Sequence, residues 1–186
     1  MKKKSLSAIF ILLGFCLYGI LHAEQGVFYS SEKGKFIMPF GSSYDYSDIK
    51  VKRAVDGDTL ELENGERVRL IGIDTPDMHA SDKLQRDSRR THQDISVIQK
   101  LGAQACEFTK NLVEGKRVSL EFDAERNDKY GRLLAYVYLK DGTFVNAEIV
   151  KQGYASLMTY PPNVRYVDLF GGLYQEAREN KRGLWK

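Results

Sequence analysis

Short apolar segments with the two-residue period of a β-strand recur along the chain from Ile49 onward. The runs typical of strands occupy residues 49–55, 59–63, 68–73, 118–122 and 133–139. Between the second and the third run stands Asn64-Gly65, a pair that tolerates the positive φ of a tight hairpin turn. The pattern therefore predicts five short strands, of which the first three follow one another closely.

Three segments show the spacing of amphipathic helices, at about 95–112, 146–152 and 164–181. A glycine that suits a helix end follows each of them: Gly115, Gly153 and Gly183. A polar segment from Pro76 to about Gln93 precedes the first helix. The order of elements predicts an α+β fold, a five-stranded OB-type β-barrel with three α-helices.

The N-terminus carries the pattern of a targeting segment. Lys2 to Lys4 are followed by a mostly apolar, uncharged run to Leu21 and by the small residue Ala23. We interpret residues 1–23 as a secretory signal cut after Ala23, which predicts a secreted or periplasmic protein. Because the run approaches the length of a membrane span, an uncleaved anchor at the membrane is the alternative.

The remaining chain divides into a short N-terminal stretch and one domain. Residues 24–48 have mixed composition, and we expect a linker or an ancillary hairpin in which Val27–Tyr29 pairs with Phe36–Met38. Residues 49–186 are predicted to form the domain. The full length of 186 residues and the hydrophobic share of 42% suit one such domain and exclude a repeat array or a disordered chain.

Net charge gives no argument for a polyanionic partner once the signal is set aside. Three of the 28 Lys+Arg residues lie in residues 1–23, which contain none of the 25 Asp+Glu residues. The remainder is therefore formally neutral, and only local clusters can indicate nucleic-acid binding. Cleavage would also remove Cys16 and leave Cys106 as the single thiol, which excludes an internal disulfide. We expect Cys106 to be a buried core thiol.

Acidic residues concentrate at the two ends of the predicted hairpin. Asp58 stands at the start of its second strand, and Asp74 and Asp77 follow its third strand. Because the turn at Asn64-Gly65 brings these segments together, Asp58 and Asp74 can share a site for a hard cation such as Ca²⁺, which takes oxygen ligands. The alternative is that these aspartates are turn and cap residues.

Two arginines lie in suitable places for phosphate chemistry. Arg69 is inside the third strand, and Arg132 directly precedes the fifth. Hydrolysis of a phosphodiester builds negative charge on oxygens that a guanidinium fork can bind in a bidentate manner. Taken alone, the position of each arginine favours a surface or salt-bridge residue.

Four blocks of sequence resemble the staphylococcal nuclease, or thermonuclease, family in the same order along the chain. They are Val55–Thr59, Arg69–Pro76, Asp128–Tyr136 and Val145–Gly153. The resemblance covers about residues 49–186. It implies a barrel enzyme that uses Ca²⁺ to hydrolyse single-stranded or frayed DNA and RNA, leaving 3′-phosphate ends, and we expect it to act as a monomer. A non-catalytic barrel that binds nucleic acid or protein is the alternative, which the joint presence of metal acids and phosphate arginines disfavours.

The resemblance also implies roles for individual residues. Asp58 and Asp74 match the calcium carboxylates, and Thr75 matches the residue that offers its backbone carbonyl. Arg69 and Arg132 match the arginines that bind the scissile phosphate, and Tyr130 matches a tyrosine near the phosphate. Asp77 stands where the family has a glutamate that orients or deprotonates the attacking water. Its arm is one methylene shorter, so we expect weaker activity unless the water shifts or Asp82 substitutes.

Three further side chains are candidate substrate contacts. Arg89 and Arg90 belong to a segment, residues 83–100, that carries five basic and two acidic residues and can guide a polyanion; a solvated surface is the alternative. Tyr160 precedes two prolines and is either a base-stacking residue or a rigid loop anchor.

The alternation of side chains along a strand restricts how Arg69 and Asp74 can face one site. Arg69 and Asp74 are five residues apart, an odd separation that points side chains to opposite faces of a regular strand. Both can address one phosphate only if the strand ends or bulges between them, and Gly72 is the expected place.

Overall fold

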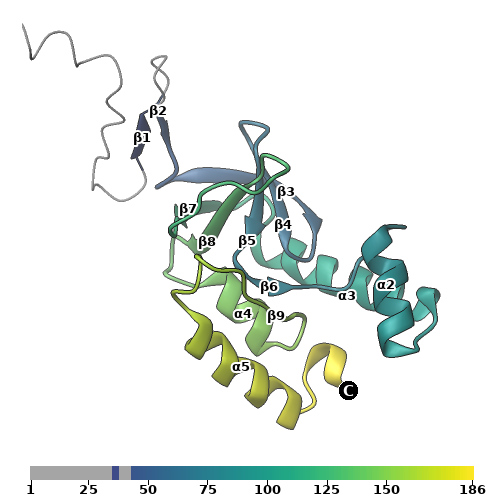
Figure 1. The fold of residues 1–186 in the computed structure, drawn as a ribbon. Helices are drawn as coiled ribbons and strands as arrows, with labels where there is room; N and C mark the ends of the chain where they lie inside the picture. Colours follow the sequence, from purple (N-terminus) through teal and green to yellow (C-terminus); the bar gives the residue numbers. More distant parts are fainter. Residues whose placement is uncertain (1–34, 38–42) are drawn as a thin grey trace, which may run out of the picture. The chain divides into compact units, whose positions relative to one another are not determined.

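The computed structural model describes residues 35–37 and 43–186, with side chains from Asp45 onward. Strands β1 (Lys35–Ile37) and β2 (Ser43–Asp45) form a two-stranded sheet (Figure 1). The expected signal segment and the strand expected at 27–29 lie outside the described residues. Part of the predicted hairpin is therefore found at β1, but the partner of β1 is β2, which follows it in sequence.

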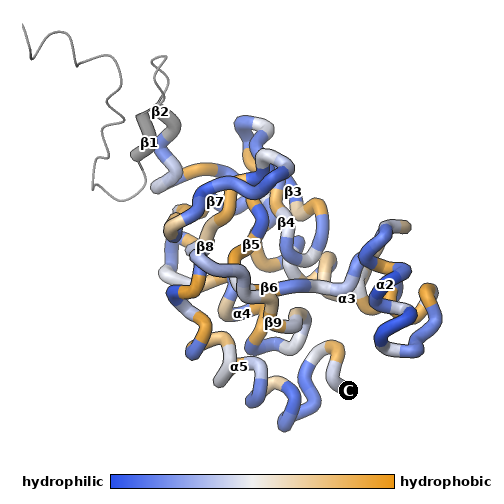
Figure 2. Tube along the Cα trace, in the orientation of Figure 1, coloured by the Kyte–Doolittle hydropathy of each residue, from blue (hydrophilic) through white to orange (hydrophobic). Residues whose placement is uncertain are grey.

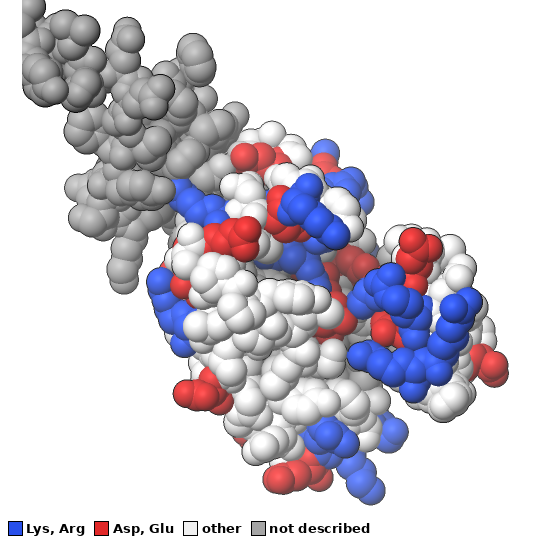
Figure 3. Space-filling view, viewed as in Figure 1, with Lys and Arg blue, Asp and Glu red and all other residues white. Residues whose placement is uncertain are grey.

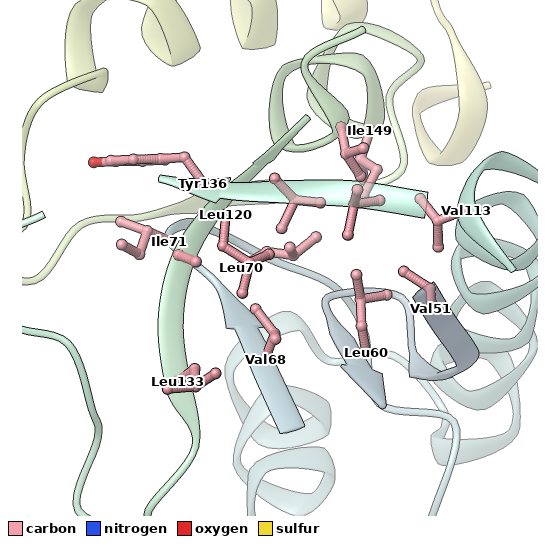
Figure 4. Close-up of a cluster of buried hydrophobic side chains, with 14 of the residues drawn as sticks. Val51, Leu60, Val68, Leu70, Ile71, Val113, Leu120, Leu133, Tyr136 and Ile149 are labelled. Atoms are coloured by element: carbon pink, nitrogen blue, oxygen red, sulfur yellow. The ribbon is translucent and has the colours of Figure 1, made fainter. Parts of the chain in front are cut away.

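A closed five-stranded barrel forms the centre of the larger unit, as the sequence predicted. Its strands are β3 (Ile49–Asp56), β4 (Thr59–Leu62), β5 (Arg67–Leu70), β7 (Arg117–Glu121) and β8 (Leu133–Leu139). They close in the order β3-β4-β5-β8-β7, with only the β5–β8 pair parallel. Alternate side chains of these strands fill the interior (Figure 4). Each fully buried leucine or valine there contributes roughly 1.5 to 3 kcal/mol to folding.

Helices cover the barrel and reinforce the segments that carry polar side chains. The three helices that the sequence predicted are α3 (Ile95–Val113), α4 (Val145–Lys151) and α5 (Val167–Glu179), and a 3₁₀ turn, η2 (Gly183–Trp185), follows. Asn146 of α4 is fully buried; its side-chain amide donates to Ile71 O at 3.0 Å, and its carbonyl oxygen accepts from Val137 N at 3.0 Å. This side chain joins α4 to β8 and to the residue that follows β5.

The described part of the chain contains four α-helices, so the predicted number of three is wrong. The additional helix is α2 (Asp82–Thr91). Ser81 is its N-cap, and the Ser81 hydroxyl accepts a hydrogen bond from Leu84 N at 2.9 Å. Leu84 is its only buried residue, and the helix is mostly hydrophilic (Figure 2). The sequence shows no apolar stripe there because one anchor suffices to hold α2 beside α3. Its stability comes instead from the cap and from basic residues in the last turn.

The third predicted strand breaks where strand parity required it to break. Strand β5 ends at Leu70, and β6 (Gly72–Asp74) begins after a change of direction and pairs with β9 (Ser156–Met158), which the sequence did not predict. Gly72 has φ +84°, a value that disfavours every residue with a Cβ. A Cβ at this position would also lie 2.5 Å from the Phe170 ring. The break turns Arg69 and Asp74 toward the same side.

Replacing Gly72 with alanine is expected to cost about 1 to 2 kcal/mol for the positive φ and roughly 1 to 3 kcal/mol more for overpacking against Phe170. Gly142→Ala is the matched control, because Gly142 has φ +86° and no atom within 4 Å of an added Cβ. Urea unfolding of both variants measures the difference. Equal losses in the two variants would show that contact with Phe170 does not constrain this turn.

Two other expectations from the sequence need correction. Tyr46, placed in the linker, is only 3% exposed and packs in the core, so the domain begins before Ile49. Cys106, expected in the core, is half-buried on α3. Burial nevertheless raises the pKa of its thiol, as do nearby carboxylates. Among the described residues, no helix has the length and apolar character of a membrane span.

Candidate active site

A cleft of about 900 Å³ collects most of the side chains that the sequence singled out. Seven of the ten predicted site residues line it: Asp58, Arg69, Asp74, Asp77, Tyr130, Arg132 and Tyr160. Arg89 and Arg90, in the last turn of α2, do not line it, whereas Arg86 of the same helix does. Basic side chains gather over α2, and acidic atoms are visible in the hollow beside it (Figure 3).

Two nearly buried aspartates form the floor of the cleft. Asp58 is 6% exposed and Asp74 is 8% exposed. Arg69 contacts both carboxylates: its Nη1 pairs with Asp58 Oδ2, and its Nη2 lies 2.9 Å from Asp74 Oδ1. Burial lowers the pKa of Arg69 and the Asp74 charge raises it, and an arginine stays protonated under either influence. The hairpin has therefore brought together the acids and one arginine, as predicted.

Thr75 adjoins these acids through its backbone and its hydroxyl. Its N–H donates to Asp58 Oδ2 at 2.9 Å and its Oγ1 lies 3.1 Å from the same oxygen. These bonds fix the carboxylate of Asp58. The Thr75 carbonyl oxygen accepts a hydrogen bond from Lys83 Nζ at 2.6 Å.

Lys83 is a site residue that the sequence did not identify. It extends from the first turn of α2, and its Nζ lies 3.0 Å from Asp74 Oδ1 and 3.0 Å from Asp77 Oδ1. The other oxygen of Asp77 accepts a hydrogen bond from the Ser81 hydroxyl. Only the formation of α2 brings Lys83 to the acids, and its sole sequence signal was membership of a basic segment.

The donor set at the cleft floor fits a hard cation. Two aspartates and a backbone carbonyl are oxygen ligands of the kind that Ca²⁺ takes. In the described part of the chain no three acidic, His or Cys side chains converge closely enough to hold a metal alone. Asp58 and Asp74 would therefore hold Ca²⁺ together with the Thr75 carbonyl and water. This small set of protein ligands leaves room in the coordination shell for a substrate oxygen.

Arg132 is held at the wall of the cleft by Asp128. Its Nε and Nη2 both lie 2.6 Å from Asp128 Oδ2. The other carboxylate oxygen accepts from Tyr130 N at 2.9 Å and Arg132 N at 3.0 Å. The sequence placed Asp128 in the segment Asp128–Tyr136 but indicated no role for it. Its role in orienting Arg132 follows from these contacts. Burial raises the pKa of its carboxyl, and the hydrogen bonds from Arg132 and Tyr130 outweigh that effect and lower it.

Asp128→Asn is expected to keep the two backbone hydrogen bonds and lose the ion pair with Arg132. Because folding lowers the pKa of Asp128, its stabilising contribution is present above its ordinary value of 3.8 and disappears as pH falls through the folded value. The thermal stabilities of the variant and the original protein should therefore differ at pH 7 and converge as the pH falls well below 3.8. A difference that does not change with pH would contradict the charge-based role.

The two candidate tyrosines project into solvent at the rim. Tyr130 is 72% exposed and Tyr160 is 69% exposed. Lys129 and Arg132 lie over the Tyr130 ring, with Nζ and Cζ at 5.0 and 5.5 Å from its centroid. The backbone around Tyr160 is anchored by the nearly buried Asn163, whose side chain bonds to the backbone of Glu125. The tyrosine ring is thus available at the cleft, and Asn163 serves as the loop anchor.

Packing of α3 places the segment that carries Asp77. A Cβ at Gly102 of α3 would lie 2.6 Å from Pro76 O and 2.7 Å from the backbone of Asp77. Only glycine lets the helix come this close. Asp82, which the sequence offered as a substitute for Asp77, is exposed and does not line the cleft. Asp56, which the sequence left without a role, does line it, and burial raises the pKa of its carboxyl.

Comparison with known proteins gives one consistent result. The family model described as "Staphylococcal nuclease homologue" matches residues 67–186. The thermonuclease of Staphylococcus intermedius is 40% identical over 139 residues, covering 73% of this chain and 74% of that protein. The thermonuclease of Staphylococcus hyicus is 31% identical over 160 residues, covering 84% and 86%. Endonuclease YncB of Bacillus subtilis is 38% identical over 143 residues; the match covers 74% of this chain and 61% of that protein.

Proposed function

The chain belongs to the staphylococcal nuclease family, and we propose that it is a Ca²⁺-dependent nuclease that hydrolyses single-stranded or frayed DNA and RNA and leaves 3′-phosphate ends. The nuclease activity itself accords with the thermonuclease and endonuclease relatives. The observation that carries the finer proposal is the convergence of Asp58, Asp74, Arg69 and Arg132 on one cleft. A barrel that only binds nucleic acid has no need for metal acids paired with two arginines.

Each side chain has a place in the proposed chemistry. Bound Ca²⁺ would neutralise charge on the scissile phosphate. Arg69 and Arg132 would bind the equatorial oxygens of the phosphate, on which negative charge grows as water attacks. Such charge–charge interactions are stronger in a cleft than in open water. Asp77 is to accept the proton of the attacking water, and the hydrogen bond from the Ser81 hydroxyl holds its carboxylate in place.

The rim of the cleft suits an unpaired strand better than a duplex. The exposed rings of Tyr130 and Tyr160 offer surfaces on which separate bases can stack, and each such contact is worth roughly 1 to 3 kcal/mol. Bases inside a duplex are not available for such stacking. Arg89 and Arg90, in the last turn of α2, extend the positive charge beyond the cleft and are proposed to guide the polyanion, although Arg90 is also paired with Asp87.

The N-terminal pattern supports secretion of the enzyme. We propose that residues 1–23 direct export and are removed after Ala23, which places the nuclease outside the cytoplasm. The mass of the exported protein tests this proposal, and we expect the mass of residues 24–186. Protein with an intact N-terminus in the membrane fraction would favour the anchored form instead.

The decisive experiment is digestion of denatured DNA and of RNA by residues 24–186, with Ca²⁺ or with a chelator. We expect both substrates to be cut with Ca²⁺ and neither with chelator, and the products to carry 3′-phosphates. Arg132→Ala is the control that removes one phosphate ligand and no metal ligand. Binding of single strands without any cleavage would replace the proposal with a binding module.

A further inference from the structure

Three oxygens surround the ammonium group of Lys83, and they come from the residues that are proposed to hold the metal and activate the water. Lys83 Nζ lies 2.6 Å from Thr75 O, 3.0 Å from Asp74 Oδ1 and 3.0 Å from Asp77 Oδ1. An ammonium group has three donors and no acceptor. Lys83 donates hydrogen bonds to Thr75 O and Asp77 Oδ1 and forms an ion pair with Asp74.

A metal ion and this ammonium group require the same oxygens. The Thr75 carbonyl and the Asp74 carboxylate are among the oxygen groups proposed above to hold Ca²⁺. Asp74 Oδ1 is already shared by Arg69 Nη2 at 2.9 Å and Lys83 Nζ at 3.0 Å. A Ca²⁺ ion on the same oxygen would add two further positive charges a few ångströms away, and like charges that close in a partly dry site repel strongly. Binding of Ca²⁺ at Asp74 and Thr75 therefore opposes the presence of the Lys83 ammonium group there.

We propose that Lys83 is an internal competitor of the metal: it occupies the metal's oxygens in the unloaded enzyme, and Ca²⁺ binding displaces it and frees Asp77. The proposal rests on the Ca²⁺-dependent function above. Displacement would remove one of the two groups that hold the Asp77 carboxylate and leave it free to approach a water. The same cation that neutralises the phosphate thus makes the proposed general base available.

The anchoring of α2 makes this displacement easier than it would be for Arg69. Arg69 extends from the barrel strand β5, and its side chain is 14% exposed. Lys83 extends from α2, which has Leu84 as its single buried residue, and its side chain is 24% exposed. A lysine on a lightly anchored helix can swing into solvent at little cost, since its flexible stem keeps the charge hydrated.

Competition predicts that removing the Lys83 charge tightens metal binding. If the oxygens are available only in the minority of molecules in which Lys83 has left, the apparent Kd for Ca²⁺ exceeds the intrinsic value by the inverse of that fraction. We expect Lys83→Met to lower the Kd by about tenfold, which corresponds to oxygens that are free in roughly one molecule in ten.

The test is titration calorimetry of the full chain with Ca²⁺ alone, without nucleic acid. Arg86→Met is the matched control, because Arg86 lies one turn further along α2 and lines the same cleft, so it shares the general electrostatic effect of a lost positive charge. We expect its Kd to fall by about twofold at most, because salt screens a charge that touches no ligand. Lys83→Arg, which keeps the charge, should not bind Ca²⁺ more tightly than the original protein.

Thermal unfolding supplies the second readout. Without Ca²⁺, Lys83→Met should melt at a lower temperature, because the carboxylates of Asp74 and Asp77 lose a partner; saturating Ca²⁺ should raise its melting temperature more than that of the original protein. A lysine with a purely structural role would lower the melting temperature and leave the Kd unchanged or weaker, and that result would overturn the proposal.

The proposed function and this inference fail in different ways. Absence of any Ca²⁺ binding in the original protein would overturn the Ca²⁺-dependent function and the competition together. Normal Ca²⁺ binding and cleavage, with the same Kd for Lys83→Met and Arg86→Met, would overturn only the competition.

Discussion

Replacing Arg132 with lysine is expected to lower kcat on denatured DNA roughly 100- to 1,000-fold, the range for loss of one preorganised charge-stabilising group. The planar guanidinium of Arg132 is oriented by Asp128 through Nε and Nη2. A lysine keeps the charge but not the fork that matches two phosphate oxygens, and it cannot make the same two contacts with Asp128. The growth of negative charge during water attack would then lack a fixed partner.

Arg117→Lys is the control for this prediction. Arg117 lies on β7, pairs with Asp48 and does not line the cleft, so the same chemical change there should leave kcat unaltered. Initial rates at saturating Ca²⁺ and several substrate concentrations separate kcat from KM. If Arg132→Lys loses no more activity than Arg117→Lys, Arg132 does not stabilise the transition state.

Lengthening Asp77 to glutamate is expected to raise kcat, by up to about 100-fold, because a catalytic carboxylate misplaced by about 1 Å can cost that factor. Asp77 lines the cleft, and its short side chain accepts a hydrogen bond from the Ser81 hydroxyl. The additional methylene carries the carboxylate toward the centre of the cleft, where the attacked phosphate must lie. Single-turnover rates with bound substrate measure the chemical step directly.

Asp82 provides the comparison for Asp77. It is exposed and outside the cleft lining, so Asp82→Glu should leave the rate unchanged, and so should Asp82→Asn. A large loss with Asp82→Asn would mean that Asp82 substitutes for the glutamate of the family. An unchanged or lower rate with Asp77→Glu would mean that the attacking water already meets the shorter arm.

The sequence alone was sufficient to predict the barrel and the break in its third strand. Strands β5 and β7 bury alternate side chains, and β8 is an almost continuously apolar run; both patterns are local properties of the chain. Parity also required the break near Gly72, because Arg69 and Asp74 cannot otherwise face one site. The acids came together partly for a local reason: Asp58 directly precedes β4, a tight turn pairs β4 with β5, and Asp74 lies on β6, shortly after the end of β5.

Tertiary structure decided the features that depend on distant partners or on a single contact. The short strand β9 pairs with β6 across more than eighty residues, and three residues carry no usable periodicity. Helix α2 is anchored by Leu84 alone among its buried residues, so no apolar stripe predicted it, yet it brings Lys83 to Asp74 and Asp77. The spacing of apolar residues determines which faces of the strands and helices are buried. Which charged side chains contact one another depends on tertiary packing, because packing sets the position of each backbone segment.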